Sequence, residues 1–181
     1  MYYLENKDLG KLFAVMYEKN RTHHLVALTQ FFCGGRISQV LALQGQDIFD
    51  VNGRTVVKIH SAKQGFDRIH NLHTDTRPEF DMSPLIALAK VRPLARLFGG
   101  TTRQFFNLSL KRYCAEAGLH TDFGHSHMFR HSCAMEIWTA TQRLGTISHF
   151  LGHRSPATAC FYLAESDGKL AQAAMDNYQF D

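Results

Sequence analysis

Apolar residues recur at helical spacing along most of this chain, and this spacing predicts a mainly helical fold. The first helix is expected to begin near Asn6, whose side chain is suited to capping a helix start. One face of this helix carries Leu9, Leu12, Phe13 and Met16. A second apolar helix, at about 23–33, should end at Gly34-Gly35, because glycine adopts the left-handed conformation that ends many helices. A short helix at 37–43 follows.

The pattern changes at 55–72, where β-branched residues flank a Lys-Gln-Gly turn and predict a β-hairpin. Helical spacing returns near residue 82. A further helix is expected to begin after a threonine cap at position 101 or 102 and to end at Gly118. The apolar face of this helix consists of Phe106, Leu110, Tyr113 and Ala117. Four more helices are predicted, at about 127–140, 146–151, 156–164 and 168–178.

These elements predict a fold that is mainly α with a small antiparallel β-sheet (α+β). The chain has 181 residues, enough for one domain with a sizeable core, and it contains no internal repeat, low-complexity tract or linker. We therefore expect residues 1–181 to form a single domain.

Composition narrows the class of protein. No apolar run approaches the roughly 20 residues of a membrane helix, and the start MYYLENKD lacks a signal-peptide pattern. We therefore expect a cytoplasmic protein without a membrane partner. The cysteines are far apart and form no C-x-x-C pair, so we expect free thiols rather than disulfides or a zinc site. They are Cys33, Cys114, Cys133 and Cys160.

The formal net charge is only +4, but its distribution is more informative. No acidic residue occurs between Asp81 and Glu116, a stretch that holds six basic residues. A stretch in which all charged residues are basic suits a surface that faces phosphates, and a solvated helix face is the alternative. The candidate DNA-binding residues in it are Arg92, Arg96, Arg103, Lys111 and Arg112.

Three histidines and an arginine lie within 125–131. His127 and Arg130 are three residues apart and share a helical face, although one such pair is weak evidence in a chain with 11 histidines. A metal site is disfavoured, because no carboxylate or cysteine lies at ligand spacing and no H-E-x-x-H motif occurs. His125 and His131 are expected to be core or surface residues.

A second stretch, 150-FLGHRSPATACFYLA-164, holds a histidine and a tyrosine in a fixed relation. Gly152 is expected to end one helix, His153 follows it, and a serine-proline pair starts the next helix. Tyr162 lies two turns into that helix. Alternatively, His153 caps a helix end and Tyr162 is a core tyrosine.

Together these stretches resemble the motifs of the tyrosine recombinases, also called phage-type integrases. In that family an arginine in G-x-R-x-S-E and a hairpin lysine precede an H-x-x-R pair, an L-G-H triplet and a tyrosine nine residues after its histidine. Here these elements stand as 34-GGRISQ-39, Lys63 in 62-AKQG-65, 127-HMFRHSCA-134, 151-LGH-153 and Tyr162. All occur in the family's order, and the resemblance extends from about residue 4 to 165.

The resemblance implies a site-specific recombinase that cuts and rejoins double-stranded DNA, with no metal or other cofactor. Tyr162 would attack the phosphorus and form a 3′-phosphotyrosyl link. Arg36 and Arg130 would neutralise the charge that grows on the phosphate oxygens, and His153 would hydrogen-bond the phosphate.

The remaining roles concern proton transfer and assembly. His127 is the candidate base for the tyrosine, and Lys63 would protonate the departing 5′ oxygen. The family's mode of action further implies a homotetramer on DNA, and the free protein is expected to be a monomer.

Two departures from the family pattern leave alternatives open. Gln39 stands where the family usually has an acid. The chain also starts where the catalytic domain starts, without the N-terminal helical domain that closes a DNA clamp in most relatives. It is therefore either an excised catalytic domain or a compact protein resembling the short fimbrial-switch invertases. A type IB topoisomerase and a non-catalytic DNA-binding remnant are the alternative functions.

Overall fold

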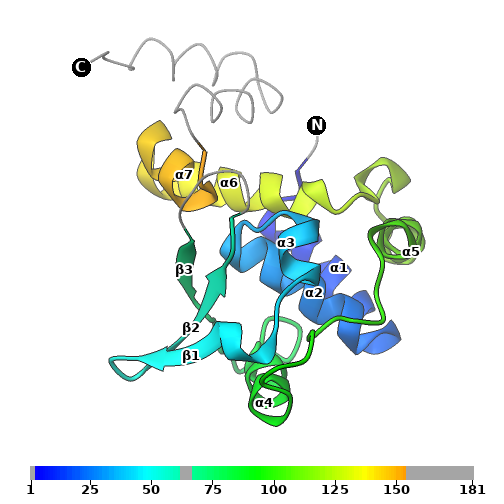
Figure 1. Cartoon of the computed structure of the whole chain (residues 1–181). Coiled ribbons are helices and arrows are strands. Elements are labelled where there is room, and N and C mark those ends of the chain that lie inside the picture. Colours follow the sequence, from blue (N-terminus) through cyan, green and yellow to red (C-terminus); the bar gives the residue numbers. More distant parts are fainter. Residues whose placement is uncertain (1–2, 62–66, 154–181) are drawn as a thin grey trace.

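The computed structural model describes residues 3–61 and 67–153, and within these ranges it is mainly helical with one small antiparallel sheet (Figure 1). The predicted fold class is confirmed. The α-helices are α1 (Asn6–Lys19), α2 (Arg21–Cys33), α3 (Ile37–Leu41), α4 (Ser83–Val91), α5 (Arg103–Glu116), α6 (His127–Thr141) and α7 (Leu144–Leu151). Two 3-10 turns, Gly45–Asp47 and Thr121–Phe123, lie between them. The helices expected at 156–164 and 168–178 lie outside the described residues.

The sheet has three strands, β1 (Ile48–Val51), β2 (Arg54–Ile59) and β3 (Arg68–Asn71), in the order β1-β2-β3. The antiparallel pairing of β2 with β3, from Val56↔Asn71 to Ile59↔Arg68, confirms the predicted hairpin. Strand β1 was not predicted. It pairs with β2 across the two-residue turn Asn52-Gly53, where both residues have positive φ (49° and 76°). An Asn-Gly pair is itself a strong hairpin signal.

Some helix ends agree with the sequence prediction, and one does not. The prediction that Asn6 caps α1 is wrong: Glu5 stands at the N-cap position without a side-chain hydrogen bond, and Asn6 is the first helical residue. Asn20 instead caps α2 by accepting a hydrogen bond from the His23 N–H. Thr102 caps α5 as expected. Gly34 ends α2 in the left-handed conformation, as predicted.

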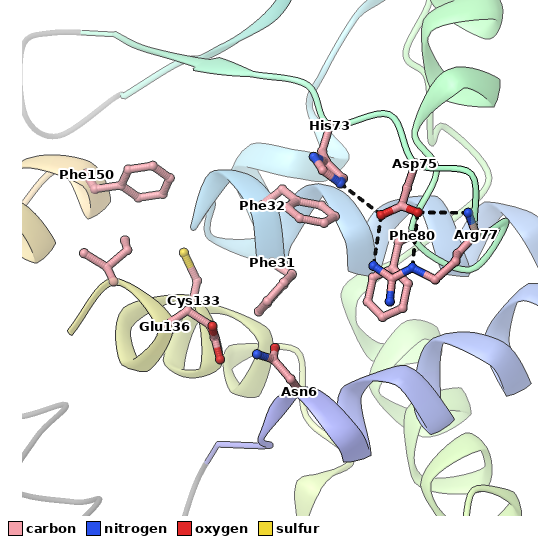
Figure 2. A pocket seen from close by; sticks show the side chains of 11 residues that line it. Asn6, Phe31, Phe32, His73, Asp75, Arg77, Phe80, Cys133, Glu136 and Phe150 are labelled. Atoms are coloured by element: carbon pink, nitrogen blue, oxygen red, sulfur yellow. Dashed lines mark hydrogen bonds and ion pairs between the residues drawn. The ribbon is translucent and has the colours of Figure 1, made fainter. Parts of the chain in front are cut away.

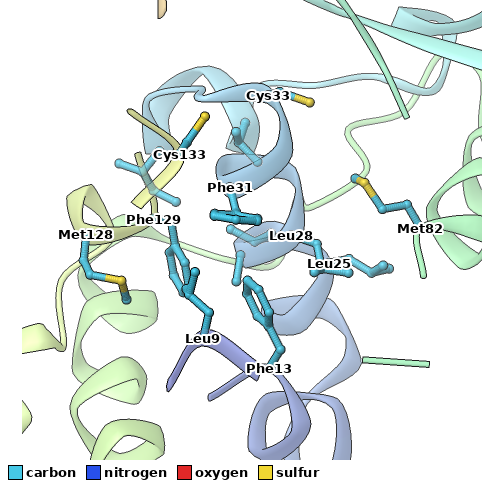
Figure 3. Close-up of a cluster of buried hydrophobic side chains, with 14 of the residues drawn as sticks. Leu9, Phe13, Leu25, Leu28, Phe31, Cys33, Met82, Met128, Phe129 and Cys133 are labelled. Atoms are coloured by element: carbon cyan, nitrogen blue, oxygen red, sulfur yellow. The ribbon is translucent and has the colours of Figure 1, made fainter. Parts of the chain in front are cut away.

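The core forms around α2, which is buried along most of its length because it packs against α1, α3 and α6. Phe13 of α1 stacks on Phe129 of α6, with ring centroids 5.7 Å apart, and meets Phe31 of α2 edge-on at 5.8 Å (Figure 3). The predicted apolar face of α1 is buried, as are Phe106, Leu110 and Tyr113 of α5. This aromatic packing fixes α6 against α2, so that the residue after Phe129 faces the end of α2.

Two further expectations concern cysteines and membranes. Cys33, Cys114 and Cys133 are buried free thiols, as predicted, while Cys160 lies outside the described residues. None of the helices in the described ranges is long and apolar enough to cross a membrane.

Candidate functional site

Arg130 lies at the centre of the site and is completely buried, although arginine is rarely found in a protein interior. It occupies the first turn of α6. One terminal nitrogen, Nη1, donates a hydrogen bond to the Gly34 carbonyl at the end of α2. The other, Nη2, donates to the Leu151 carbonyl at the end of α7 (3.0 Å) and to His153 Nε2 (2.8 Å). The guanidinium therefore connects two helix ends and a histidine.

The ends of α2 and α7 explain why a buried cation is tolerated there. The last carbonyls of a helix have no partner within the helix and carry partial negative charge. Gly34 and Leu151 supply two such oxygens, and both accept from Arg130. Gly152 ends α7 in the left-handed conformation, as predicted, and turns the chain toward Arg130.

His153 contacts Arg130 through Nε2, which fixes the protonation state of the ring. Arginine can only donate, so Nε2 must accept and the ring proton lies on Nδ1. Burial and the charges of Arg130, Arg36 and Arg68 lower the pKa of His153 to about 3. His153 is therefore a neutral hydrogen-bond donor at physiological pH.

Arg36 stands at the start of α3 and is exposed. Its backbone N–H donates to the Gln39 side-chain oxygen (3.0 Å), and the Gln39 amide nitrogen donates to the His60 carbonyl (2.7 Å). Gln39 thus contacts the backbone of Arg36 and ties the start of α3 to the end of β2. The guanidinium charge of Arg36 lies close enough to depress the pKa of His153 and of His127.

His127 is the first residue of α6 and is exposed to solvent, unlike Arg130 three residues later. Although the residue is exposed overall, part of its ring lies among protein atoms, and this partial desolvation together with the charge of Arg130 lowers the pKa of His127 to about 4, so the ring is neutral at pH 7. Its neighbour on the helix, His131, is buried with ring centroids 5.2 Å apart. Burial lowers the pKa of His131 to about 4 as well.

The structure brings together four of the six residues proposed from sequence, namely Arg36, His127, Arg130 and His153. They come from three parts of the chain: the start of α3, the first turn of α6 and the residue after α7. The other two, Lys63 and Tyr162, lie outside the described residues.

The described base of the hairpin that carries Lys63 is held by ion pairs. The Asp67 carboxylate lies 3.0 Å from Lys58 Nζ and 3.3 Å from His60 Nδ1, and it accepts from the Ser61 N–H (3.2 Å). The hydrogen bond from Lys58 holds the pKa of Asp67 below its ordinary value. Both sides of the hairpin are therefore joined next to its turn.

Sequence reasoning missed Arg68, a buried residue at the start of β3. Its Nη1 donates to the Phe150 carbonyl (2.7 Å), one residue before the carbonyl that Arg130 binds. The motifs gave no signal for it, because a strand arginine next to Asp67 is indistinguishable in sequence from a surface ion pair.

The five basic residues proposed for DNA binding are all exposed. Two of them, Arg92 and Arg96, lie between α4 and α5, and three lie on α5. Arg103, the first residue of α5, is close enough for its charge to depress the pKa of His127. The basic stretch therefore adjoins the site at the start of α5. In the described ranges, no group of three or more His, Cys, Asp or Glu residues is arranged to hold a metal.

A pocket of about 490 Å³ lies beside the end of α7, and none of the proposed site residues lines it. Figure 2 shows its aromatic side, with Phe31, Phe32 and Phe150, opposite a polar side where Arg77 pairs with Asp75 at 3.0 Å. The sequence gave no indication of this pocket.

Comparisons with known proteins found a matching family model and solved structures of the same fold. A family model described as "Phage integrase family" matches residues 2–169. Crystal structures of the XerH site-specific recombinase bound to difH DNA, in pre- and post-cleavage complexes, match with a TM-score of 0.72 at 22% identity. The post-cleavage match covers 95% of this chain and 52% of XerH.

Two further structures match. The XerA recombinase has a TM-score of 0.71 at 18% identity, covering 98% of this chain and 64% of XerA. A lambda integrase dimer bound to a COC′ core site has a TM-score of 0.61 at 18% identity, covering 99% of this chain and 49% of that protein. The chain thus spans roughly half to two thirds of the length of these proteins, and the matches show a shared fold. No curated protein sequence matches the chain.

Proposed function

Because the chain belongs to the phage integrase family, we propose that it is the catalytic portion of a site-specific recombinase that cuts and rejoins DNA strands. The observation that carries this proposal is the meeting of Arg36, His127, Arg130 and His153 at the ends of three helices. These residues are two planar cations and two neutral histidines, a set suited to a phosphodiester in its transition state.

Arg36 and Arg130 act on the phosphate. The exposed guanidinium of Arg36 can present paired donors to the non-bridging oxygens, whereas the buried guanidinium of Arg130, whose Nη atoms bond Gly34, Leu151 and His153, contributes its positive charge. The burial of Arg130 strengthens this effect, because a preorganised cation in a low-dielectric site does not have to reorient during the reaction. His153, neutral and protonated on Nδ1, donates a hydrogen bond to the same phosphate group.

Tyr162 is the nucleophile. Its phenol oxygen attacks the phosphorus, the bond from phosphorus to the 5′ oxygen breaks, and a 3′-phosphotyrosyl link forms. The phenol has an ordinary pKa of about 10 and must lose its proton, which passes to the neutral His127 ring. A bound phosphate offsets the charge of the two arginines, which raises the pKa of His127 and makes it a stronger base.

Lys63 donates a proton to the departing 5′ oxygen, since an alkoxide is a poor leaving group. The second strand's 5′ hydroxyl reverses these steps and rejoins the DNA. The reaction needs no metal ion in this scheme, because the arginines supply the positive charge.

The partner in this scheme is double-stranded DNA, contacted through the exposed basic residues of the stretch from Arg92 to Arg112. Solved relatives are complexes with their DNA sites, which supports this choice of partner. We infer a homotetramer on DNA, as strand exchange between two duplexes involves four cleavage sites.

The test is covalent trapping on supercoiled DNA that contains the native site. Tyr162→Phe should retain the fold and DNA affinity yet form no adduct, because it lacks only the attacking oxygen. Tyr113→Phe is the matched control: Tyr113 is buried on α5, where its hydroxyl bonds His23 at 3.0 Å, and this variant should still form the adduct.

The outcomes separate the alternative functions. An adduct from Tyr162→Phe would overturn the assigned nucleophile. No adduct from the unmutated protein, with intact DNA binding, would indicate a non-catalytic DNA-binding remnant. Relaxed DNA as the sole product would indicate topoisomerase activity instead of recombination.

A further inference from the structure

Arg68 is a second buried arginine beside the site, and no motif accounts for it. It is 6% exposed and pairs with Ile59 in the hairpin between β2 and β3. No carboxylate lies within ion-pair distance of it in the described ranges, and its Nε has no hydrogen-bond partner there. Burial and the charges of Arg130 and Arg36 lower the pKa of Arg68 to about 10. A buried cation next to two other cations is destabilising unless specific contacts hold it.

The first of these contacts is with α7. Arg68 Nη1 donates to the Phe150 carbonyl at 2.7 Å. Phe150 lies in the last turn of α7, where carbonyls lack a partner within the helix and attract cations. Arg130 binds the next carbonyl, that of Leu151. Two buried arginines therefore hold the last turn of α7, three residues before His153.

The second contact is with Gln39. Arg68 Nη2 lies 3.5 Å from the Gln39 side-chain oxygen, which also accepts from the Arg36 N–H at 3.0 Å. Gln39 reaches the end of β2 as well, by donating to the His60 carbonyl at 2.7 Å. Arg68 is thus linked through one amide to the segment that carries Arg36.

Three parts of the site meet at this one side chain. The end of α7 leads to His153, the start of α3 carries Arg36, and Arg68 itself belongs to the hairpin that carries Lys63. All three segments are far apart in sequence, and their relative position determines where the phosphate-binding groups point. A misplacement of about 1 Å in such groups is enough to slow a reaction roughly a hundredfold.

We propose that Arg68 is a positioning residue for strand transfer, which locks the His153 turn and the Arg36 segment onto the catalytic hairpin. Its Nη1 and Nη2 donors point to Phe150 and Gln39, so the role proposed for Arg68 is to position these segments. The inference rests on the proposed function for its effect on rate, but its structural part, the hold on the His153 turn, is measurable without catalysis.

Arg68→Met is the main variant, since methionine fills similar space without donors or charge. Arg68→Lys keeps the charge but replaces the planar fork by a single ammonium group, which cannot reproduce both contacts. The matched control is Arg54→Met, which removes an exposed arginine from β2 in the same sheet.

Two properties are measured on each variant. The first is amide hydrogen exchange at Gly152 and His153, whose N–H groups bond the His149 and Ser148 carbonyls at the end of α7 (3.1 and 2.8 Å). The second is the rate of adduct formation at saturating DNA, compared with the DNA dissociation constant.

Arg68→Met should speed exchange at both amides by about tenfold or more, because the last turn of α7 opens more often. It should also slow adduct formation by about tenfold or more, with DNA affinity changed less than about twofold. Arg68→Lys should fall between Arg68→Met and the unmutated protein, and Arg54→Met should match the unmutated protein in both measurements.

The positioning role of Arg68 and the proposed function are tested by different measurements. Exchange at Gly152 and His153 that stays unchanged in both Arg68 variants would overturn the positioning role, whatever the activity. Faster exchange with an unchanged adduct rate would also overturn it, since the held turn would then not matter for the reaction. If Arg68→Met does not fold, hydrogen exchange and the adduct rate of Arg68→Lys test the positioning role in the same way. Absence of an adduct from the unmutated protein would contradict the proposed function alone, and the exchange comparison would still decide the positioning role.

Discussion

At the scale of single residues, the guanidinium group of Arg130 has a structural role, and the chemical role that we propose belongs to the same group. Its donors hold the Gly34 and Leu151 carbonyls and the His153 ring. Arg36 differs, because it is exposed and its backbone, not its guanidinium, contacts Gln39. The two arginines that the sequence motifs treat alike are therefore expected to respond differently to substitution. We expect loss of Arg130 to affect folding as well as the proposed chemistry, and loss of Arg36 to affect the proposed chemistry alone.

The proposed role of Lys63, a single proton transfer, also depends on one residue. Lys63→Ala should slow cleavage of ordinary DNA by roughly a hundredfold or more, the range typical of losing a general acid. Replacing the bridging 5′ oxygen by sulfur should remove this defect, because a thiolate leaves without protonation. The measurement is the adduct rate on both substrates.

The controls for Lys63 are variants with different defects. Tyr162→Phe should gain nothing from sulfur, because its defect is in attack, and Arg36→Ala should stay slow, because its defect is in charge stabilisation. Equal impairment of Lys63→Ala on both substrates would show that another group supplies the proton.

At the scale of elements, the site depends on how closely the end of α2 approaches the end of α7. Gly34 has φ 57°, and a Cβ at this position would overlap the Leu151 side chain. Gly118 at the end of α5 has φ 71°, yet a Cβ there would meet nothing within 4 Å. The two glycines share the same backbone requirement but differ in their surroundings.

Substitution of these glycines separates backbone strain from steric overlap. Gly118→Ala should lower the free energy of unfolding by about 1 kcal/mol, the cost of left-handed backbone in alanine. Gly34→Ala should cost a further 1–3 kcal/mol or so, because Leu151 is buried and must shift. Urea unfolding measures both values. Equal losses in the two variants would show that α2 and α7 are not in tight contact.

The hairpin is the other element on which the site depends. Asp67 joins its two sides through Lys58, His60 and the Ser61 N–H, and Gln39 joins its base to α3. These contacts place the described base of the hairpin beside the start of α3, which carries Arg36.

At the scale of the whole molecule, buried neutral histidines make stability depend on pH. Burial lowers the pKa of His70 and of His131 to about 4, below the ordinary value of 6.5 that the unfolded chain has. Between these values the unfolded state binds more protons than the folded state, so stability rises with pH. It is fully present above about pH 6.5 and is lost as pH falls toward 4.

The expected result is a thermal midpoint that drops steadily from pH 7 to pH 5. Each buried ring contributes up to about 1.4 kcal/mol per pH unit within that window. His70→Gln should flatten the dependence, because it removes one of the buried rings. A midpoint independent of pH in the unmutated protein would contradict this account.

DNA affinity is also a property of the whole molecule, because it sums many phosphate contacts. Log affinity should fall linearly with log salt, with a slope near −0.9 per neutralised phosphate. Replacing Arg92 and Arg96 together by glutamine should reduce the slope by about 2, while Arg54→Gln, outside the basic stretch, should not change it. A flat salt dependence would exclude phosphate contacts as the main source of affinity.

Sequence patterns alone predicted the helices and the hairpin that the structure describes, and they supplied the candidate residues of the site. Helical periodicity gave α1, α5 and α6 because each must bury one apolar stripe, and Gly34, Gly118 and Gly152 marked helix ends because they adopt left-handed backbone. The candidate residues Arg36, His127, Arg130 and His153 were proposed because their motifs resemble those of the tyrosine recombinases. The assignments of Lys63 and Tyr162 stay predictions.

The burial and the contacts of these residues become visible only when the chain is folded. No spacing rule indicates that Arg130 is fully buried, that two helix ends supply its acceptors, or that Arg68 holds the next carbonyl of α7. Arg130 lies 96 positions from Gly34 and 21 positions from Leu151 in the chain. Arg68 lies 82 positions from Phe150. Local sequence patterns reflect interactions within a few residues, whereas the burial of a charge depends on where distant helix ends meet.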